Sequence, residues 1–417
     1  MECFDVIIIG SGPAGTATAL NLLRADPALA GNILLLDKAV HPREKICAGG
    51  LIPHTLDCLN ALEIPLTVPH VQVNRARVQA RPGHEVVCEE GGMCSIIRRN
   101  EFDFLLVRTA AERGAEIRQG EKVIRLVREP DGIRVVTEKT TYRTRIVVGA
   151  DGSGSRVRRQ LIGQTRPPVG KAIMSDVPIS ETDWDGFVQQ RYDFNFLPVQ
   201  DGLRGYLWAF PCLIDQVAHV NLGIYSLGVN SFSNAALQDC LTKEISTFST
   251  ATASKSERIQ HRMVGGGHVH SFGQTRRLRA FPIHGYAPER PLAAPHVVLV
   301  GDAAGAEPLM GEGISFAFEY GAFAAQAICE ALQTKDFSFD AYTRTITQSW
   351  LGKKLARLSF ATKLFYGRTA RLWFTLAARN TRLQSIGLKW YNGVDGWHQR
   401  SGWDAVRAVI NRYPRQP

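Results

Sequence analysis

The chain has 417 residues, of which 45% are hydrophobic and 21% charged, and its formal net charge is +10. The length suits two or three closely joined domains, and the hydrophobic content is ordinary for a soluble globular protein. No apolar run reaches about 18 residues, which argues against a transmembrane helix. The eight cysteines are scattered without a C-x-x-C pair, so we expect neither a metal site nor a disulfide framework.

Residues 5–37 are predicted to form a strand, a glycine turn, a helix and a second strand. The turn has the pattern G-x-G-x-x-G, made by Gly10, Gly12 and Gly15. Such glycines permit a tight turn, close approach of a pyrophosphate and close packing of helix on strand, while the helix N-terminus attracts phosphate. Asp37 ends the second apolar run, where this unit needs an acceptor for a ribose hydroxyl. We therefore predict dinucleotide binding rather than a simple glycine-rich turn.

A polar connection, residues 38–51, follows and contains Cys47-Ala48-Gly49-Gly50, whose glycines suit backbone that passes close to a flat or charged group. Apolar spacing and turn residues predict the next elements: a helix over 55–62, a hairpin over 71–89, a strand end and amphipathic helix over 96–115, and a β-meander over 115–148. The meander ends in a buried strand and a tight turn at Gly149-Ala150-Asp151-Gly152.

Residues 171–279 have a different sequence pattern. Apolar and polar side chains alternate with period two at 192–196, 205–210 and 219–225. This alternation predicts an antiparallel sheet with one face on a cavity or core. The same region is predicted to contain a helix over 235–248 and a turn at residues 265–267. Residues 297–302 return to the buried-strand pattern and lead, through residues 311–314, into an alanine-rich helix that ends near residue 332.

Three segments that are far apart in the sequence fit one cofactor: the first glycine turn, residues 149–152, and Gly301-Asp302 with residues 311–314. Taken alone, Gly301-Asp302 also fits a helix N-cap after a strand. In combination the segments resemble the FAD-dependent hydroxylase superfamily, the p-hydroxybenzoate hydroxylase-like flavoproteins. Within it the chain is most similar to the geranylgeranyl reductase family, over roughly residues 5–330.

The resemblance implies FAD as the cofactor and gives each motif a role. Asp37 is expected to bind the adenosine ribose, Arg99 to contact FAD, and Asp302 to bind the ribityl chain. Backbone N–H groups of residues 311–314, at the start of a helix, are expected to face the flavin pyrimidine and stabilise the reduced flavin. The cofactor-binding set is Gly10, Gly12, Pro13, Ala14, Gly15, Asp37, Lys38, Cys47, Ala48, Gly49, Arg99, Asp151, Gly301, Asp302, Gly311, Gly313 and Ile314.

Two further segments resemble parts of the reductase active site. The Cys47 segment is similar to a Cys-Gly-Gly loop that lies over the flavin, with Ala48 in place of the first glycine. Its thiol is a candidate general acid, although a small buried cysteine explains the same residue. Tyr206-Leu-Trp208-Ala-Phe210-Pro211 resembles the Tyr-x-Trp-x-Phe-Pro strand that lines the substrate cavity. Tyr206 and Trp208 are the candidate catalytic residues there, and an aromatic core stripe is the alternative interpretation.

The C-terminal region holds the excess charge: residues 350–417 contain 13 Lys and Arg against two acids, and five of the seven tryptophans. A helical stripe is predicted at Leu355, Leu358, Thr362, Phe365, Thr369, Leu372 and Leu376, with Lys354, Arg357, Arg368, Arg371 and Arg379 on the remaining surface. Cationic helices with aromatic residues suit an anionic membrane surface. A helical layer that covers the rest of the protein explains the same pattern. Nucleic-acid binding is not expected, because no recognition motif accompanies the charge.

The resemblance implies an α/β protein with a Rossmann-type FAD-binding domain, an inserted antiparallel β-sheet substrate domain and a helical C-terminal region. We assign 1–70, 95–170 and 280–335 to the first, 71–94 and 171–279 to the second, and 336–417 to the third. The first strand begins at residue 5 and leaves no room for a signal peptide, so a cytoplasmic protein is expected, with peripheral membrane contact as an addition.

The implied activity is reduction of carbon–carbon double bonds in an isoprenoid or similar apolar substrate, with Cys47 or water as the proton donor. No second glycine fingerprint marks a nicotinamide site, so transiently bound NADPH or a ferredoxin is expected as the electron donor. One alternative is an oxygen-using monooxygenase or halogenase, although the halogenase-type Trp-x-Trp-x-Ile-Pro is absent. The other is a non-catalytic prenyl or lipid carrier, against which the complete set of FAD motifs argues.

Overall fold

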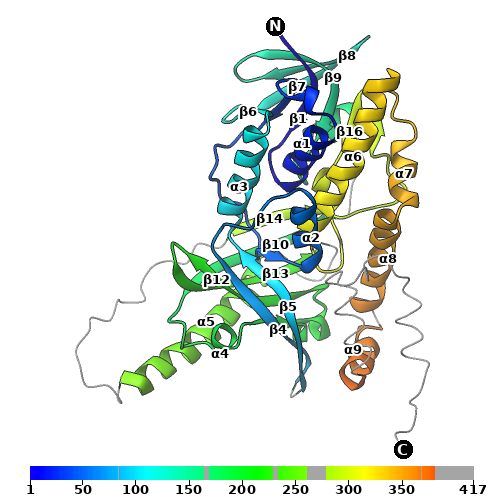
Figure 1. Cartoon of the computed structure of the whole chain (residues 1–417). Coiled ribbons are helices and arrows are strands. Elements are labelled where there is room, and N and C mark those ends of the chain that lie inside the picture. The colour runs from blue at the N-terminus through cyan, green and yellow to red at the C-terminus, as the bar shows by residue number, and fades with distance from the viewer. Residues whose placement is uncertain (83, 164–168, 229–232, 261–278, 368, 381–417) are drawn as a thin grey trace, which may run out of the picture.

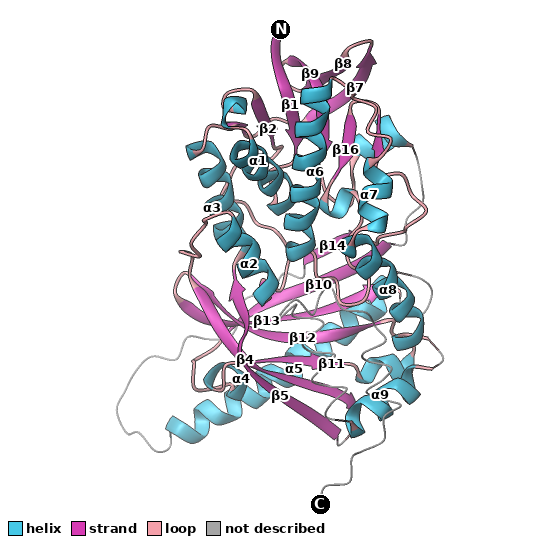
Figure 2. Cartoon of the chain, turned by 45° about the vertical axis from the view of Figure 1, so that its right-hand side comes forward, coloured by secondary structure: helices cyan, strands magenta, loops and turns pink. Residues whose placement is uncertain are grey.

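The computed structural model describes residues 1–82, 84–163, 169–228, 233–260, 279–367 and 369–380 (Figure 1). The turn expected at residues 265–267 and three of the five C-terminal tryptophans, Trp390, Trp397 and Trp403, lie outside these ranges. Two sheets stand one above the other, and the C-terminal helices run down one side of both (Figures 1 and 2).

The first sheet carries the buried apolar strands. Its order is β15-β16-β9-β1-β2-β6, with β8 paired to β9 and β7 to β8. The pairs from β16 to β6 are parallel. The side chains of residues 6–8, 33–35 and 146–148 are fully buried, as expected for a parallel sheet covered on both faces. The bounds are β1 Glu2–Ile9, β2 Ile33–Leu36, β6 Glu116–Arg118, β7 Val123–Glu129, β8 Gly132–Thr137, β9 Thr141–Gly149, β15 Ala293–Ala294 and β16 Val297–Leu299.

Three helices pack together beside this sheet: α1 (Pro13–Ala25) lies between α3 (Arg99–Glu112) and α6 (Ile314–Thr334) (Figure 2). The contact between α1 and α6 is close because Gly321 has no side chain. A Cβ there would lie 2.8 Å from the backbone nitrogen of Thr18. The alanine-rich character of α6 thus serves backbone-to-backbone packing.

The second sheet has the order β14-β10-β13-β12-β11-β4-β5-β3. Its pairs are antiparallel, as the sequence predicted, except that β4 and β11 run parallel. Strand pairing continues past the boundaries 94 and 279 drawn from the sequence, since β5 extends to Ile97 and β14 to His284. The bounds are β3 Gly50–Leu51, β4 His70–Arg81, β5 His84–Ile97, β10 Val169–Pro178, β11 Arg191–Asn195, β12 Gly205–Ile214, β13 Val217–Leu227 and β14 Arg279–His284.

Helix α5 (Asn234–Gln260) covers one face of the second sheet, together with the short α4 (Asp185–Val188). A separate apolar cluster joins them, in which Leu207 and Ile224 from the sheet pack with Leu237, Leu241 and Ile245 from α5. The opposite face of the sheet is turned toward the first sheet. Helix α2 (Pro53–Ala61) packs on α6.

The C-terminal helices are α7 (Tyr342–Gln348), α8 (Trp350–Phe365) and α9 (Ala370–Arg379). Leu355 and Leu358 are buried as predicted, but the continuous stripe is wrong beyond Phe365. The helix ends there and restarts at Ala370, which changes the rotational phase and leaves Leu372 58% exposed. Lys354 is 4% exposed, which corrects its predicted place on the surface. No helix in the described part of the chain is long and apolar enough to cross a membrane.

Candidate active site

A cavity of about 860 Å³ opens where the carboxyl ends of β1, β2, β9 and β16 meet the second sheet. Eighteen of the nineteen sequence-predicted site residues line it, and Gly15 is the exception. Strands β12, β13 and β14 contribute the opposite side through aromatic residues. The lining residues from the prediction are Gly10, Gly12, Pro13, Ala14, Asp37, Lys38, Cys47, Ala48, Gly49, Arg99, Asp151, Tyr206, Trp208, Gly301, Asp302, Gly311, Gly313 and Ile314.

The first glycine turn is built for close packing on one side and for access on the other. A Cβ on Gly15 would lie 1.9 Å from the carbonyl oxygen of Gly10, so Gly15 supports the turn from behind. Gly12 is the N-cap of α1, without a side-chain hydrogen bond at the helix start. A Cβ on Gly12 would meet only an Arg43 nitrogen, at 3.5 Å. The first turn of α1 therefore presents free N–H groups to the cavity, as a phosphate site requires.

The Asp37 carboxylate lies at the end of β2 and is held in place by hydrogen bonds from Ser11 and Ala39. Its Oδ2 accepts bonds from Ser11 N at 3.0 Å and Ser11 Oγ at 2.8 Å, and its Oδ1 accepts from Ala39 N at 2.9 Å. Burial would raise the pKa of Asp37, but these donors and Arg43 outweigh burial and lower the pKa. The group is therefore a fixed carboxylate at neutral pH.

Arg99 lies at the start of α3 and forms a bidentate pair with Asp103. Its Nε is 2.7 Å from Oδ1 and its second terminal nitrogen is 3.0 Å from Oδ2. A nitrogen of Arg43 approaches the same carboxylate at 3.4 Å. Burial alone would lower the pKa of Arg99, but Asp103 and Cys47 raise it. Arg43, which no motif identified, is thus a second fixed cation beside the glycine turn and contributes to a field suited to a diphosphate.

Asp302 and Asp151 each follow a strand of the first sheet, and their carboxylates accept hydrogen bonds from different partners. Asp302, after β16, accepts a hydrogen bond from Ser153 Oγ at 3.3 Å and borders the cavity. Asp151, after β9, accepts bonds from the backbone nitrogens of Arg156 and Val157 at 2.5 and 3.2 Å. Burial raises the pKa of Asp151. Asp151 therefore fixes the turn that borders the cavity, while Asp302 retains acceptor capacity toward it.

The segment 307–314 that precedes α6 is held from both sides. Inside it, the Glu307 carboxylate accepts hydrogen bonds from the backbone nitrogens of residues 309, 310 and 312. Outside it, the hydroxyls of three tyrosines donate to consecutive carbonyls: Tyr225 to Pro308 at 2.8 Å, Tyr366 to Leu309 at 2.8 Å, and Tyr206 to Met310. Sequence patterns identified Tyr206 but not its hydroxyl's partner, because each contact joins positions more than 50 residues apart.

Glu307 gives this segment a pH dependence. Burial raises its pKa to about 7, with Glu312 adding to the shift and the backbone donors opposing it. A folded pKa above the ordinary glutamate value of 4.5 contributes stability that is present below pH 4.5 and is lost as the pH rises through about 7. Relative to Glu307→Gln, which does not titrate, the wild type should lose roughly 1–3 kcal/mol between pH 5 and 8. Parallel thermal melts of both proteins across this range test it, and a constant difference would contradict it.

Tyr206, Trp208 and Phe210 lie on the cavity side of β12, as their alternation predicts, and we call them the aromatic wall. Trp208 Nε1 donates to Asn221 Oδ1 at 2.7 Å, and Asn221 donates to Asp176 at 2.7 Å. The indole is seated over Gly223 of β13, where a Cβ would lie 2.0 Å from the ring. This strand is therefore both an ordered aromatic core and the lining of a cavity.

Two neighbouring residues, Lys45 and Cys47, enter the cavity from the connection after β2. Cys47 Sγ accepts a hydrogen bond from Gly49 N at 3.4 Å. Lys45 was not singled out from the sequence, since it belongs to no motif. Its Nζ lies 2.8 Å from the centroid of the Phe281 ring. Burial lowers the pKa of Lys45 to about 8, against the opposing charge of Asp302.

These residues fit a dinucleotide that carries a flavin. The starts of α1 and α6 face one cavity. The α1 start has no side-chain cap, and at the α6 start Glu312 accepts a hydrogen bond from Ser315 N at 2.9 Å, one residue beyond Gly313 and Ile314. Gly12 and Gly313 leave open space in the cavity, and a fixed carboxylate and two arginines lie along it. Free N–H groups at helix starts suit a diphosphate at α1 and a flavin carbonyl at α6. The apolar aromatic wall continues the same cavity beyond these polar groups.

Several curated proteins are similar in sequence over most of the chain. An uncharacterized protein of Methanosarcina barkeri is 29% identical over 372 residues, covering 88% of this chain and 85% of its own length. A digeranylgeranylglycerophospholipid reductase of Methanosarcina acetivorans is 26% identical, covering 84% of this chain and 81% of its own length. A geranylgeranyl diphosphate reductase of Rhodobacter capsulatus is 28% identical, covering 79% of this chain and 76% of its own length.

Solved structures share the fold. A geranylgeranyl bacteriochlorophyll reductase-like protein from Thermoplasma acidophilum superposes with a TM-score of 0.73 at 20% identity, covering 100% of this chain and 98% of its own. The halogenase PltM superposes with a TM-score of 0.65 at 17% identity, covering 98% and 85%. The family described as FAD binding domain matches residues 3–348. The chain therefore belongs to the FAD-binding-domain family and is an FAD-dependent oxidoreductase with geranylgeranyl reductase-like relatives.

Proposed function

We propose that this protein is an FAD-dependent reductase that saturates carbon–carbon double bonds of an isoprenoid or similar apolar substrate. The observation that carries the proposal is the continuity of one cavity from the glycine turn at Gly12 to the aromatic wall. An apolar chain bound along that wall would lie in the same space as the cofactor-binding segments. The names of the curated relatives, which include reductases of geranylgeranyl compounds, support the substrate class.

When bound and reduced, FAD supplies a hydride to one carbon of the double bond. The other carbon must take a proton, and we assign its delivery to the Cys47 thiol or to water. The Tyr206 hydroxyl already donates to the Met310 carbonyl, so we assign Tyr206 and Trp208 to substrate binding and the exclusion of water. We further propose NADPH or a ferredoxin as the electron donor, and the first and second sheets as cofactor and substrate domains.

The test is an anaerobic reaction of the FAD-loaded protein with NADPH or dithionite and a geranylgeranyl compound. The expected product gains two hydrogens per reduced double bond by mass spectrometry. The aerobic alternative deserves the same assay because PltM and a flavin-dependent brominase share the fold. Oxygen consumption in proportion to product would replace the reductase with an oxygenase or halogenase. A colourless protein whose flavin cannot be restored would instead favour a lipid carrier.

The role of Cys47 is testable by itself. Cys47→Ala should lower the anaerobic rate of product formation about 100-fold if the thiol is the general acid. The rate is compared per bound FAD, because Cys47 lines the cofactor cavity. Cys329→Ala, on α6 and away from the lining of the cavity, is the matched control. An undiminished rate in Cys47→Ala would assign the proton to water.

We also propose that α8 and α9 rest on an anionic membrane surface while the protein remains cytoplasmic. Phe360 and Leu372 are 62% and 58% exposed, and Lys353 and Lys363 are exposed on α8. Replacing both apolar residues by serine should reduce co-sedimentation with phosphatidylglycerol-containing vesicles at least tenfold. Each apolar side chain is expected to contribute roughly 1.5 kcal/mol or more to the free energy of membrane binding. Vesicles of phosphatidylcholine alone are the control. Equal sedimentation of wild type and variant would refute this contact.

A further inference from the structure

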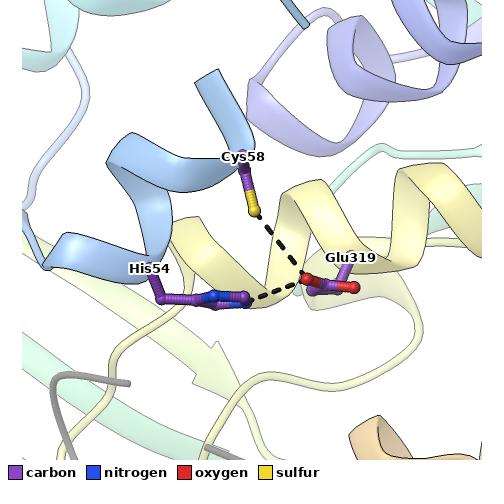
Figure 3. A group of neighbouring side chains, drawn as sticks. All are labelled: His54, Cys58 and Glu319. Atoms are coloured by element: carbon purple, nitrogen blue, oxygen red, sulfur yellow. Dashed lines mark hydrogen bonds and ion pairs between the residues drawn. The ribbon is translucent and has the colours of Figure 1, made fainter. Parts of the chain in front are cut away.

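Outside the cavity, three side chains with metal-ligating atoms meet between α2 and α6 (Figure 3). His54 Nε2 lies 2.9 Å from Glu319 Oε1, and Cys58 Sγ lies 3.8 Å from the same oxygen. All three ligand atoms lie within 4.8 Å of one another. None of the three residues lines the flavin cavity.

The fold, rather than local sequence, creates this group. His54 and Cys58 are four residues apart on α2 and therefore share a face of that helix. This face packs on α6, which supplies Glu319 from more than 250 positions away. The Trp350 ring at the start of α8 and the imidazole pack in a T-shaped arrangement, with 5.6 Å between ring centroids. His54 is buried, whereas Cys58 and Glu319 are half-buried, so an ion from solvent has access.

The charges that surround the group favour a cation. The acids Glu319, Asp57 and Glu312 lie near the Cys58 thiol. Lys354 of α8 faces Glu312, Glu307 and Glu319. Among the described residues, acids therefore outnumber Lys354 around the three side chains. A divalent cation would compensate the excess of negative charge.

We propose that His54 Nε2, Cys58 Sγ and Glu319 Oε1 bind one Zn²⁺ ion. One nitrogen, one thiolate sulfur and one carboxylate oxygen are ligands that Zn²⁺ accepts, and a softer or harder ion would match only part of this set. Tetrahedral coordination with bonds of about 2.0–2.3 Å needs ligand atoms about 3.5 Å apart, within the observed spread. The Cys58 thiol releases its proton to solvent on binding, and water occupies the fourth position.

The site has a structural consequence for the flavin cavity. Helix α2 follows the Cys47–Gly50 segment, and α6 follows the Gly311–Ile314 segment, both of which line the cavity. An ion bound to both helices would fix these two segments relative to each other. Bound Zn²⁺ should therefore raise the melting temperature of the protein through mass action.

The experiment is a titration of the purified, untagged full-length protein with Zn²⁺, and with Co²⁺ as a spectroscopic probe. One equivalent should bind, and Co²⁺ should give the absorption of a thiolate-to-cobalt charge transfer. Cys58→Ser, a near-isosteric change, should lose that band and weaken Zn²⁺ binding more than tenfold. His54→Gln and Glu319→Gln should weaken binding as well. Cys329→Ser, on the same α6 with a half-buried thiol, should bind like the wild type.

Two results would overturn the proposal. One is a wild type that binds no stoichiometric Zn²⁺, and the other is a Cys58→Ser variant that keeps both the affinity and the cobalt band. In either case the three side chains form only the His54–Glu319 ion pair and the Cys58–Glu319 hydrogen bond between α2 and α6. Because the readouts are metal stoichiometry, spectrum and melting temperature, they do not depend on whether the protein reduces isoprenoids.

Discussion

Replacing Gly12 by alanine should leave the apo protein folded and lower its affinity for FAD about 100-fold. The backbone of Gly12 has a φ of −75°, which alanine adopts without strain. The added Cβ would be no closer than 3.5 Å to its nearest neighbour, so ordinary contacts are kept. The methyl group would instead occupy the space through which a diphosphate approaches the first N–H groups of α1.

Gly15→Ala is the matched control, because it tests packing in the same turn. Its Cβ would lie 1.9 Å from the carbonyl oxygen of Gly10, which should cost about 3 kcal/mol of folding free energy. Melting temperatures of the apo proteins and flavin-fluorescence titrations separate the two effects. If Gly12→Ala binds FAD like the wild type, the diphosphate does not lie at this helix start.

The sequence was informative where a motif is local. The strand, turn and helix around Gly12 are specified by consecutive residues, and the alternation at Tyr206 and Trp208 fixes which side chains share a face. Both features are present in the structure, and they meet in one cavity although they are about 200 residues apart. The proximity of the glycine turn and the aromatic strand in the folded protein could be expected only from the resemblance to a family. Their spacing in the sequence carries no information about this proximity.

Contacts between distant elements were not predictable in the same way. Lys354 reads as one more basic residue on an amphipathic helix, yet it is buried near Glu307 and Glu312 of the segment before α6. The break in the C-terminal stripe after Phe365 follows from tertiary packing, because Ala370 and Phe374 take over the buried face. The pair His54 and Cys58 likewise has no C-x-x-C signal, and becomes a ligand set only with Glu319 from α6.

Asp103→Leu should be among the most destabilising single changes near the cavity, at about 3–5 kcal/mol of folding free energy. Asp103 is fully buried and is the bidentate partner of Arg99, whose charge would be left inside the protein. Arg99→Met should cost less, because Asp103 keeps Arg43 at 3.4 Å. Asp103→Leu should cost more folding free energy than Arg99→Met because two guanidinium groups share the one Asp103 carboxylate.

The double variant Arg99→Met with Asp103→Leu separates folding from binding. The double variant removes the Arg99 charge together with Asp103, and Arg43 keeps Asp37, whose Oδ2 lies 3.8 Å from Arg43 Nε. It should therefore recover most of the stability lost in Asp103→Leu. Its FAD affinity should nevertheless stay below that of the wild type, since Arg99 lines the cavity and supplies positive charge beside the glycine turn. Chemical denaturation of the apo proteins and FAD titration measure the two quantities. A double variant with wild-type affinity would restrict Arg99 to a structural role and leave Arg43 as the cation that attracts the diphosphate.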